Sequence, residues 1–371
     1  MKAIITILDG ITETSMPFNE FVLYRAKHYL DEKPILIICN SPKTLPQVEI
    51  PQNLKIIYAG KNVFHIRKVI KGVIRECKKS GMPYLFHLHQ VQSALLSEVA
   101  MLGTGFRKKV LFTVHNTFTG YSLHNKILSF LNSAFAQRIT CVSKAAYLGY
   151  PRIIKKLKKS RILPVQNGVD TERIDDILNF EKEKVCSATI DFMYVARMVP
   201  VKNHKFLIEV LKRTNKNIRF IFVGLEDPDG EIRKLAKVYK VDDRVVFTGL
   251  IPRNEVFERL AQADAYISSS VLEGLPISVL EAMYCSLPCF LSDIPQHKEI
   301  KEKTDDALTI LPLTINRWVE ELNKFAALSK EQRNRMGEKN RINVKKYFSL
   351  ERMHKEYSRT YKVLLDDKCE G

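Results

Sequence analysis

The chain has 371 residues, 45% of them hydrophobic, and carries 59 lysines and arginines against 41 acidic residues, a net charge of +18. This length exceeds what one hydrophobic core usually holds, so two domains are expected. No run approaches 18 consecutive apolar residues, which argues against a membrane-spanning helix. The amino-terminal apolar stretch ends at Asp9 without a small-residue cleavage site and indicates a first buried strand, not a secretion signal.

The seven cysteines are an odd number and form no CxxC pair. Free thiols in a reducing cytoplasm explain them better than disulfides do. Cys285 and Cys289 are four residues apart, but no histidine or further cysteine completes a tetrahedral set, so packing is the expected role. The composition therefore predicts a cytoplasmic protein without a zinc site.

The first half of the chain alternates short apolar runs with longer stretches of helical spacing. Strands are predicted over residues 3–8, 35–39, 54–58, 84–89, 110–115, 138–142 and 162–165. Helices are predicted between them over residues 18–30, 63–79 and 123–136. Strands that alternate with helices indicate a parallel sheet with helices on both faces.

The second half repeats this pattern. Strands are predicted over residues 191–195, 218–223, 244–247 and 265–269, and helices over 277–284, around Trp318 within 304–339, and over 350–365. A polar segment over 175–187 separates the two series. We therefore predict an α/β chain of two doubly wound, Rossmann-like domains, 1–178 and 185–345, followed by a last segment, 346–371. Because open parallel sheets bind ligands at the carboxyl ends of their strands, the two domains are expected to face each other across a cleft.

The stretch with the strongest chemical signal runs from the strand at 265–269 through a glycine-containing turn into the helix at 277–284. The first turn of a helix has N–H groups without partners inside the helix, so it favours anions. Glu273 lies in the turn and Glu281 lies roughly 6 Å along the helix axis from its start. Carboxylates accept hydrogen bonds from hydroxyls, so a diphosphate flanked by two sugars would fit between them. Such a molecule is a nucleotide sugar.

The string EGLPISVLEAM, residues 273–283, resembles the E-x7-E signature of retaining glycosyltransferases of family 4, which have the GT-B fold. This resemblance implies that Glu273 holds hydroxyls of the transferred sugar and Glu281 those of the ribose. In DFMYVARMVPVK, Arg197 and Lys202 match the family's clamp on the donor diphosphate. Fixed cations stabilise the charge that develops on a leaving diphosphate, so no metal and no cofactor are expected.

The same resemblance assigns further positions. His115 in TVHN would hydrogen-bond the transferred sugar, and His89 is a candidate on the acceptor side. Gly10 stands alone where the family has a glycine pair near the diphosphate. The final helix is expected to return to the first domain.

The remaining donor-binding candidates follow strands or lie at the start of the helix at 277–284: Leu250, Ile251, Gly274, Leu275, Ser278 and Val279. Asp227-Pro228-Asp229 superficially forms a metal-holding DxD, but its polar loop indicates a turn.

These motifs and the family resemblance predict a retaining hexosyltransferase that takes its sugar from a nucleotide diphosphate. UDP is the expected carrier, because it is the most frequent one in the family. The expected acceptor is a hydroxyl of a growing, lipid-linked bacterial surface glycan such as capsule, O-antigen or exopolysaccharide. A GT-B nucleotide-sugar epimerase is the first alternative. A basic nucleic-acid-binding protein is the second; the sequence has no recognisable RNA or DNA module, so no nucleic acid is expected as a partner.

The positive charge is uneven along the chain. Residues 1–178 hold 26 lysines and arginines against 12 acidic residues, whereas residues 179–371 hold 33 against 29. Two clusters in the first half, 67–79 and 152–161, mix cations with apolar residues at helical spacing, as in a helix at a membrane interface. We therefore expect peripheral docking on the anionic inner face of the cell membrane.

Overall fold

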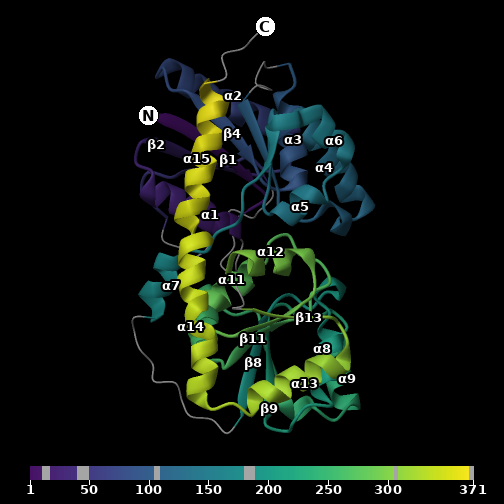
Figure 1. Ribbon diagram of the computed structural model, residues 1–371. Helices are drawn as coiled ribbons and strands as arrows, with labels where there is room; N and C mark the ends of the chain where they lie inside the picture. Colours follow the sequence, from purple (N-terminus) through teal and green to yellow (C-terminus); the bar gives the residue numbers. More distant parts are fainter. Residues whose placement is uncertain (11–16, 40–49, 104–108, 179–188, 305–307, 367–371) are drawn as a thin grey trace. The chain divides into compact units, whose positions relative to one another are not determined.

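The computed structural model describes all residues except 11–16, 40–49, 104–108, 179–188, 305–307 and 367–371 (Figure 1). The chain divides into two compact units. The first unit contains Met1–Asn167 and Leu350–Gly371, and the second contains Gly168–Ser349. Each has its own parallel sheet, so the predicted α/β fold class of two Rossmann-like domains is confirmed.

The first unit is built on a seven-stranded sheet in the order β3-β2-β1-β4-β5-β6-β7. All six neighbouring pairs are parallel. The strands are β1 (Lys2–Leu8), β2 (Glu32–Ile38), β3 (Lys55–Tyr58), β4 (Tyr84–Leu88), β5 (Val110–Val114), β6 (Arg138–Cys141) and β7 (Ile162–Pro164). They match the seven predicted strands to within a few residues at each end, because each contains a short apolar run; the runs of the inner strands β1, β4 and β5 are buried on both faces, whereas the edge strand β3 is partly exposed.

Helices cover both faces of this sheet. Ile5 and Ile7 of β1 pack in a core with α2 (Val63–Lys79) and α3 (Val91–Met101). Ile4 and Leu8 point to the opposite face, where α1 (Pro17–His28) and α15 (Leu350–Asp366) complete a second core. The other helices of the unit are α4 (Leu123–Phe135), α5 (Lys144–Leu148) and α6 (Arg152–Lys158), with 3-10 turns η2 (Phe118–Gly120) and η3 (Lys159–Arg161).

The last helix, α15, belongs structurally to the first unit. Its Tyr361 hydroxyl lies 2.7 Å from Nδ1 of His87, a buried residue of β4, and Nε2 of His87 lies 2.6 Å from the Thr113 hydroxyl of β5. On the same helix the Ser358 hydroxyl accepts a hydrogen bond of 3.0 Å from Arg25 of α1. A helix from the far end of the sequence therefore supplies part of the core around β1 and β4.

The second unit has a six-stranded parallel sheet in the order β10-β9-β8-β11-β12-β13. Its strands are β8 (Ile190–Val195), β9 (Ile218–Val223), β10 (Val245–Gly249), β11 (Ala265–Ser268), β12 (Cys289–Ser292) and β13 (Leu308–Leu311). Its helices are α7 (Thr171–Leu178), α8 (His204–Leu211), α9 (Glu231–Val238), α10 (Arg253–Gln262), α11 (Ile277–Tyr284), α12 (Pro295–Thr304), α13 (Ile315–Ala326) and α14 (Lys330–Tyr347), with 3-10 turns η4 (Pro200–Lys202) and η5 (Asp242–Arg244).

The second unit differs from the sequence-based expectation in two of its strands and in the residue at which it begins. Strand β12 was not predicted, and β13 lies inside the stretch 304–339 for which only helix was predicted. Both strands have four residues, as the predicted β11 does, so length alone does not explain the difference; β12 follows α11 after four residues, and β13 lies between α12 and α13. The unit boundary falls at Asn167, before α7, whereas the first domain was expected to extend to residue 178. Residues 179–187 of the expected linker lie outside the described residues.

Helix α7 joins the second unit through polar contacts that a sequence pattern does not show. Asp175 accepts hydrogen bonds from the Tyr284 hydroxyl at 2.9 Å and from Arg341 at 2.5 Å. Arg173 donates to the Asn254 side chain at 2.7 Å. These partners lie more than 80 residues further along the chain, so the polar segment that suggested a linker begins inside a docked helix.

The described cysteines are free thiols, as predicted: Cys39, Cys77, Cys141, Cys285 and Cys289. Burial raises the pKa of Cys285 to about 12, which keeps that thiol protonated at neutral pH. The two others, at positions 186 and 369, lie outside the described residues.

Both sheets reverse their strand order at one point. The reversal lies between β1 and β4 in the first unit and between β8 and β11 in the second. Loops that leave adjacent strands at such a switch point diverge to opposite faces and open a crevice at the carboxyl ends. Each unit therefore has a defined position for a ligand.

Candidate active site

Lys202 and Glu273 meet at the switch point of the second sheet. Lys202 ends the 3-10 turn that follows β8, and Glu273 lies in the turn that follows β11. The Nζ of Lys202 is 2.5 Å from Oε1 of Glu273, and the two side chains are 23% and 10% exposed. Sequence reasoning named both residues from separate motifs, and the structure brings them together as an ion pair.

Three hydroxyl groups, of Tyr194, Ser269 and Ser270, position the Lys202–Glu273 ion pair through hydrogen bonds. The Ser270 hydroxyl donates to Oε1 of Glu273 at 2.6 Å and lies 2.8 Å from the buried Tyr194 hydroxyl. Tyr194 donates in turn to the backbone carbonyl of Lys202 at 3.0 Å, and Ser269 donates to the same carbonyl at 3.1 Å. Because these bonds connect β8, β11 and both loops, the carboxylate and the ammonium group are held in a defined geometry.

Arg197 lies in the loop directly after β8 and is exposed. Its backbone is supported by β9, since Met198 donates to the Leu225 carbonyl at 2.8 Å and Ala196 to the Val223 carbonyl at 2.9 Å. Gly224 has φ +143°, and a Cβ added there would overlap the Ala196 carbonyl. Only glycine permits this close approach of the two strand ends, so Gly224 helps to position the loop that carries Arg197.

Glu281 is buried and paired, which the sequence did not indicate. Its side chain is 1% exposed, and Oε2 accepts a hydrogen bond of 3.0 Å from Nη1 of Arg253. Nη2 of Arg253 forms an ion pair with Oε1, and the guanidinium lies 4.8 Å from the centre of the Phe257 ring. A carboxylate has about four lone-pair positions, so a bidentate arginine leaves capacity for a ligand hydroxyl.

Four further donor-side candidates lie at the start of α11: Gly274, Leu275, Ser278 and Val279. Pro276 precedes the helix and offers no side-chain cap, so the first N–H groups, including those of Ser278 and Val279, have no partner inside the helix. The Ser278 hydroxyl accepts from Tyr266 at 2.9 Å, and the Val279 side chain is packed in the core. Gly274 and Leu275 are buried in the turn.

Leu250 and Ile251 follow the edge strand β10. Leu250 is 51% exposed, and Ile251 is half-buried. The Gly249 carbonyl before them accepts a hydrogen bond of 3.0 Å from Gly224, which ties this loop to the loop after β9. They therefore lie at the carboxyl edge of the sheet, as Arg197 does, and Leu250 exposes an apolar side chain there.

In the first unit, His89 and His115 follow adjacent strands and contact each other. Nδ1 of His89 lies 3.0 Å from Nε2 of His115. Desolvation lowers the pKa of His115 to about 3, and burial followed by the neighbouring His87 lowers the pKa of His89 well below its usual value. Both rings are therefore neutral near pH 7, and one N–H donates to the other ring nitrogen.

This protonation state predicts a pH dependence of stability. His115 binds a proton in the unfolded chain below about pH 6.5, but in the folded protein only near pH 3. The unfolded state then holds more protons, so the stabilisation is complete above pH 6.5 and is lost as the pH falls toward 3, by on the order of 1 kcal/mol per pH unit. Urea unfolding between pH 7.5 and 5.5 should show a smaller loss for His115→Gln than for wild type. Exposed His124→Gln is the control, and parallel curves for all three proteins would contradict the assignment.

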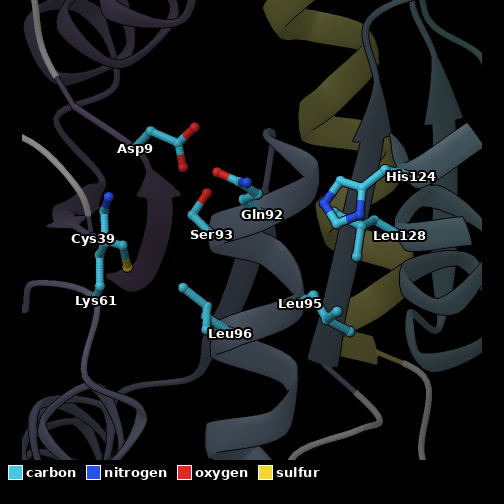
Figure 2. Close-up of a pocket in the computed structure, with 9 residues that line it drawn as sticks. All are labelled: Asp9, Cys39, Lys61, Gln92, Ser93, Leu95, Leu96, His124 and Leu128. Carbon is cyan, nitrogen blue, oxygen red and sulfur yellow. The ribbon is translucent and has the colours of Figure 1, made fainter. Parts of the chain in front are cut away.

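A pocket of about 370 Å³ lies at the switch point of the first sheet (Figure 2). Asp9, directly after β1, and Gln92 and Ser93, in the first turn of α3, place polar groups at one end of it. Leu95 and Leu96 of α3 form an apolar end. The other lining residues are Cys39, Lys61, His124 and Leu128.

The backbone N–H of Asp9 donates to the Gln90 side chain at 2.6 Å, which joins the two strand ends beside this pocket. Gly10 is buried next to Asp9, while Ile11 and Thr12, which complete the predicted motif, lie outside the described residues. The pocket joins anionic, cationic and apolar groups in one small volume, so it suits an amphipathic ligand with hydroxyl groups.

Asp227 forms a turn, as expected, because its carboxylate accepts from the backbone N–H groups of Glu231 and Ile232 at the start of α9. Within the residues that the structure describes, no group of three histidine, cysteine or acidic side chains could hold a metal ion. Over the same part of the chain, no helix has the length and apolar content needed to cross a bilayer.

Comparison with known proteins gives a related family for the second unit and a fold for the chain. Residues 175–343 match the family described as Glycosyl transferases group 1. Over the whole chain the fold is that of GT-B glycosyltransferases: HepE of Anabaena, solved in complex with UDP and glucose, superposes with a TM-score of 0.76 over 98% of this chain and 100% of that one, at 14% identity. The fold and the site of the second unit thus define a protein similar to group 1 glycosyltransferases.

Three curated relatives are transferases. The chain is 29% identical to the putative glycosyltransferase EpsF of Bacillus subtilis, covering 48% of this chain and 48% of the relative. It is 26% identical to the capsular polysaccharide biosynthesis glycosyltransferase CapH of Staphylococcus aureus, over 56% and 57%. It is 31% identical to UDP-Gal:alpha-D-GlcNAc-diphosphoundecaprenol alpha-1,3-galactosyltransferase of Escherichia coli, over 36% and 37%. The chain spans about half the length of the curated relatives it matches first.

Sequence reasoning missed the residues that support the site. Ser270 could have been noticed, since a serine three positions before Glu273 lies on the same turn. Tyr194 and Arg253 had no such signal: a tyrosine in a buried strand and an arginine at a helix start are both ordinary. Their roles arise from contacts with residues 76 and 28 positions away.

Proposed function

We propose that the protein is a retaining, metal-independent glycosyltransferase of family 4 that moves a hexose or related sugar from a nucleotide diphosphate, with UDP as the first candidate. The observation that carries this proposal is the Lys202–Glu273 pair, 2.5 Å apart at the switch point of the second sheet. Both residues lie within the segment that matches the group 1 family.

The site residues receive the following roles in this proposal. Arg197 and Lys202 bind the donor diphosphate, and the unpaired N–H groups at the start of α11 add partial positive charge there. Glu273 accepts hydrogen bonds from hydroxyls of the transferred sugar, and Glu281 accepts them from the ribose while Arg253 fixes its orientation. His115 contacts the transferred sugar as a neutral hydrogen-bonding group.

The proposed chemical step is front-side substitution. The bond between the anomeric carbon and the phosphate oxygen breaks, and its electron pair remains on the phosphate. The acceptor hydroxyl oxygen bonds to the same face of the anomeric carbon, and its proton passes to the departing phosphate oxygen. Lys202 and Arg197 stabilise the charge on the diphosphate as it leaves. The configuration at the anomeric carbon is retained.

We further propose that the acceptor is a lipid-linked glycan in the cytoplasm, reached by peripheral association with the inner face of the cell membrane. Three observations support this. The E. coli relative is named for a diphosphoundecaprenol acceptor and the S. aureus relative for capsular polysaccharide. The pocket at the first switch point has the polar and apolar lining that suits such an acceptor. Residues 1–178 carry a net charge of +14, from 26 basic and 12 acidic residues.

The proposal is tested by incubating the full chain with UDP- and GDP-sugars and a bacterial lipid extract. We expect a glycosylated lipid in the mass spectrum, a linkage with the anomeric configuration of the donor by NMR, and unchanged turnover in EDTA. Conversion of the donor sugar without any acceptor would favour an epimerase instead. Tight nucleic-acid binding at physiological salt, with no turnover of any donor, would favour the nucleic-acid alternative.

A further inference from the structure

Helix α4 is oriented with its apolar side outward. Leu123 and Ile127 are 75% and 53% exposed, and Phe130 and Leu131 are each 38% exposed. Positions i, i+4, i+7 and i+8 share one side of a helix, so these four side chains form a continuous apolar stripe on the surface. An apolar stripe of this kind normally faces the core.

The inner side of α4 is polar and anchored by hydrogen bonds. The buried hydroxyls of Ser129 and Ser133 lie 2.9 and 2.5 Å from the Tyr150 hydroxyl. The buried Asn132 amide donates to the Val91 carbonyl of α3 at 2.9 Å. Rotation of the helix to bury the apolar stripe would carry Ser129, Asn132 and Ser133 to the surface and leave the buried Tyr150 hydroxyl without these partners, at a cost of about 1–3 kcal/mol for that group. The outward orientation of the stripe is therefore a fixed property of the fold.

Helix α6 lies beside α4 and also exposes apolar side chains. Ile153 and Leu157 are exposed and lie four positions apart, while Ile154 is buried. Nζ of Lys158 donates to the Ala134 carbonyl of α4 at 3.1 Å, which holds the two helices together. Figure 1 shows α3, α4 and α6 side by side along one flank of the first unit. We call this surface the α4–α6 face; its apolar members are Leu123, Ile127, Phe130, Leu131, Ile153 and Leu157.

The stretch of chain that forms the α4–α6 face carries charge of one sign. Residues 99–169 contain twelve lysines and arginines and no aspartate or glutamate. On α6 and directly after it, Arg152, Lys156, Lys159 and Arg161 are exposed. Exposed apolar side chains among cations are the pattern of a helix that lies in an anionic lipid interface, where each cation contributes about 1 kcal/mol.

The other basic cluster, on α2, has a different character. The helix buries Ile66, Ile70 and Val73, so its apolar side is already used in the core. Its Glu76 pairs with Lys33 of β2 and Lys55 of β3 at 2.8 and 2.7 Å, so the helix also packs against the sheet through charged contacts. Helix α2 therefore resembles an ordinary solvated basic helix, and it serves as an internal comparison.

We propose that the α4–α6 face is a membrane-docking surface that inserts its apolar side chains among the headgroups of an anionic bilayer. This inference rests on the proposed lipid-linked acceptor. Helix α4 also contributes His124 and Leu128 to the pocket at the first switch point. Docking through α4 brings that pocket to the lipid headgroups, where a lipid-linked acceptor would enter it.

The test is sedimentation of the full chain with phosphatidylcholine vesicles, with and without phosphatidylglycerol. We expect wild type to bind the anionic vesicles, less strongly at high salt, and to ignore the neutral ones. Leu123→Ser/Ile127→Ser should weaken binding at least tenfold, and Val238→Ser, an exposed apolar position of the second unit, should not. Arg152→Glu/Lys156→Glu should weaken binding similarly. Lys68→Glu/Lys71→Glu makes the same charge change on α2 and should have little effect.

Equal losses in the α6 and α2 charge variants would overturn the proposal, because binding would then depend on total charge. The proposal would also be overturned if wild type bound anionic and neutral vesicles equally. It would be overturned as well if sedimentation velocity showed that the α4–α6 face mediates self-association without lipid. Nucleotide-sugar binding, measured without vesicles, separates the two proposals. Donor binding without lipid binding rejects only the docking surface, and lipid binding without any donor rejects only the transferase.

Discussion

Lys202→Ala is expected to lower kcat/KM for sugar transfer by about 10²–10³-fold, the usual loss when one fixed charge or donor at a transition state is removed. Lys202 is held by Glu273 and by hydrogen bonds to its own carbonyl from Tyr194 and Ser269. A cation that is positioned before the reaction needs no reorganisation when negative charge develops on the leaving diphosphate. Glu273→Gln should cause a comparable loss, because the amide keeps the shape but not the charge that holds Lys202.

The second unit offers a matched control pair. Lys205 and Glu231 also form an ion pair, with 2.6 Å between Nζ and Oε2, but both side chains are more than half exposed. Lys205→Ala and Glu231→Gln should keep kcat/KM within about twofold, since an exposed pair contributes little. Steady-state turnover and a thermal melt measure activity and folding for all four variants. Full activity in Lys202→Ala or Glu273→Gln, or equal losses in both pairs, would refute the assignment.

Arg253→Met is expected to destabilise the second unit by about 3–5 kcal/mol, because it leaves the buried Glu281 carboxylate without its counter-ion. Glu281 is 1% exposed and Arg253 is 9% exposed. The double variant Arg253→Met/Glu281→Leu should regain most of the lost stability, since two apolar side chains of similar size replace the pair. Donor affinity should remain low in the double variant, because the proposed ribose contact to Glu281 is gone.

Urea unfolding and titration with the nucleotide diphosphate separate these two effects. Arg259→Met in the same helix is the control: its pair with Glu255 is a surface i,i+4 contact of 2.7 Å, and its loss should change stability by less than about 0.5 kcal/mol. If Arg253→Met had the same free energy of unfolding as wild type, the Arg253–Glu281 pair would not be a buried one. Recovery of donor affinity in the double variant would show that Glu281 acts only in packing and not on the ligand.

The fold class was predictable because it depends on local patterns. The apolar runs of β1 and β4 are short and are separated by helical spacing, and both features are visible along the chain. Strands close to helices were harder to predict: β12 follows α11 after four residues, and the stretch around β13, between α12 and α13, was interpreted as helix. The boundary near residue 175 was misplaced for a related reason, since α7 is polar but docks through Asp175.

The candidate site was predictable in part. Glu273, Lys202 and Arg197 follow strands, and residues at the carboxyl ends of parallel strands meet at one edge of a sheet. The Lys202–Glu273 contact follows from that rule once the order β8-β11 is known. Arg253 could not be found in this way, because its only distinguishing property is a partner on another helix, 28 positions away.

Helix α4 shows the same difference between what local sequence predicts and what distant contacts decide. The spacing of Leu123, Ile127, Phe130 and Leu131 predicts an amphipathic helix, and the helix is present. The pattern would place that stripe in the core, yet the structure exposes it, because Tyr150 and the Val91 carbonyl bind the polar side from within. Backbone periodicity is a property of neighbours along the chain, so the order of residues alone specified two α/β units and the strand ends that carry the charged groups. Which side of a helix is buried, and which carboxylate meets which cation, depend on partners distant in sequence, and these were established only when the folded chain brought them into contact.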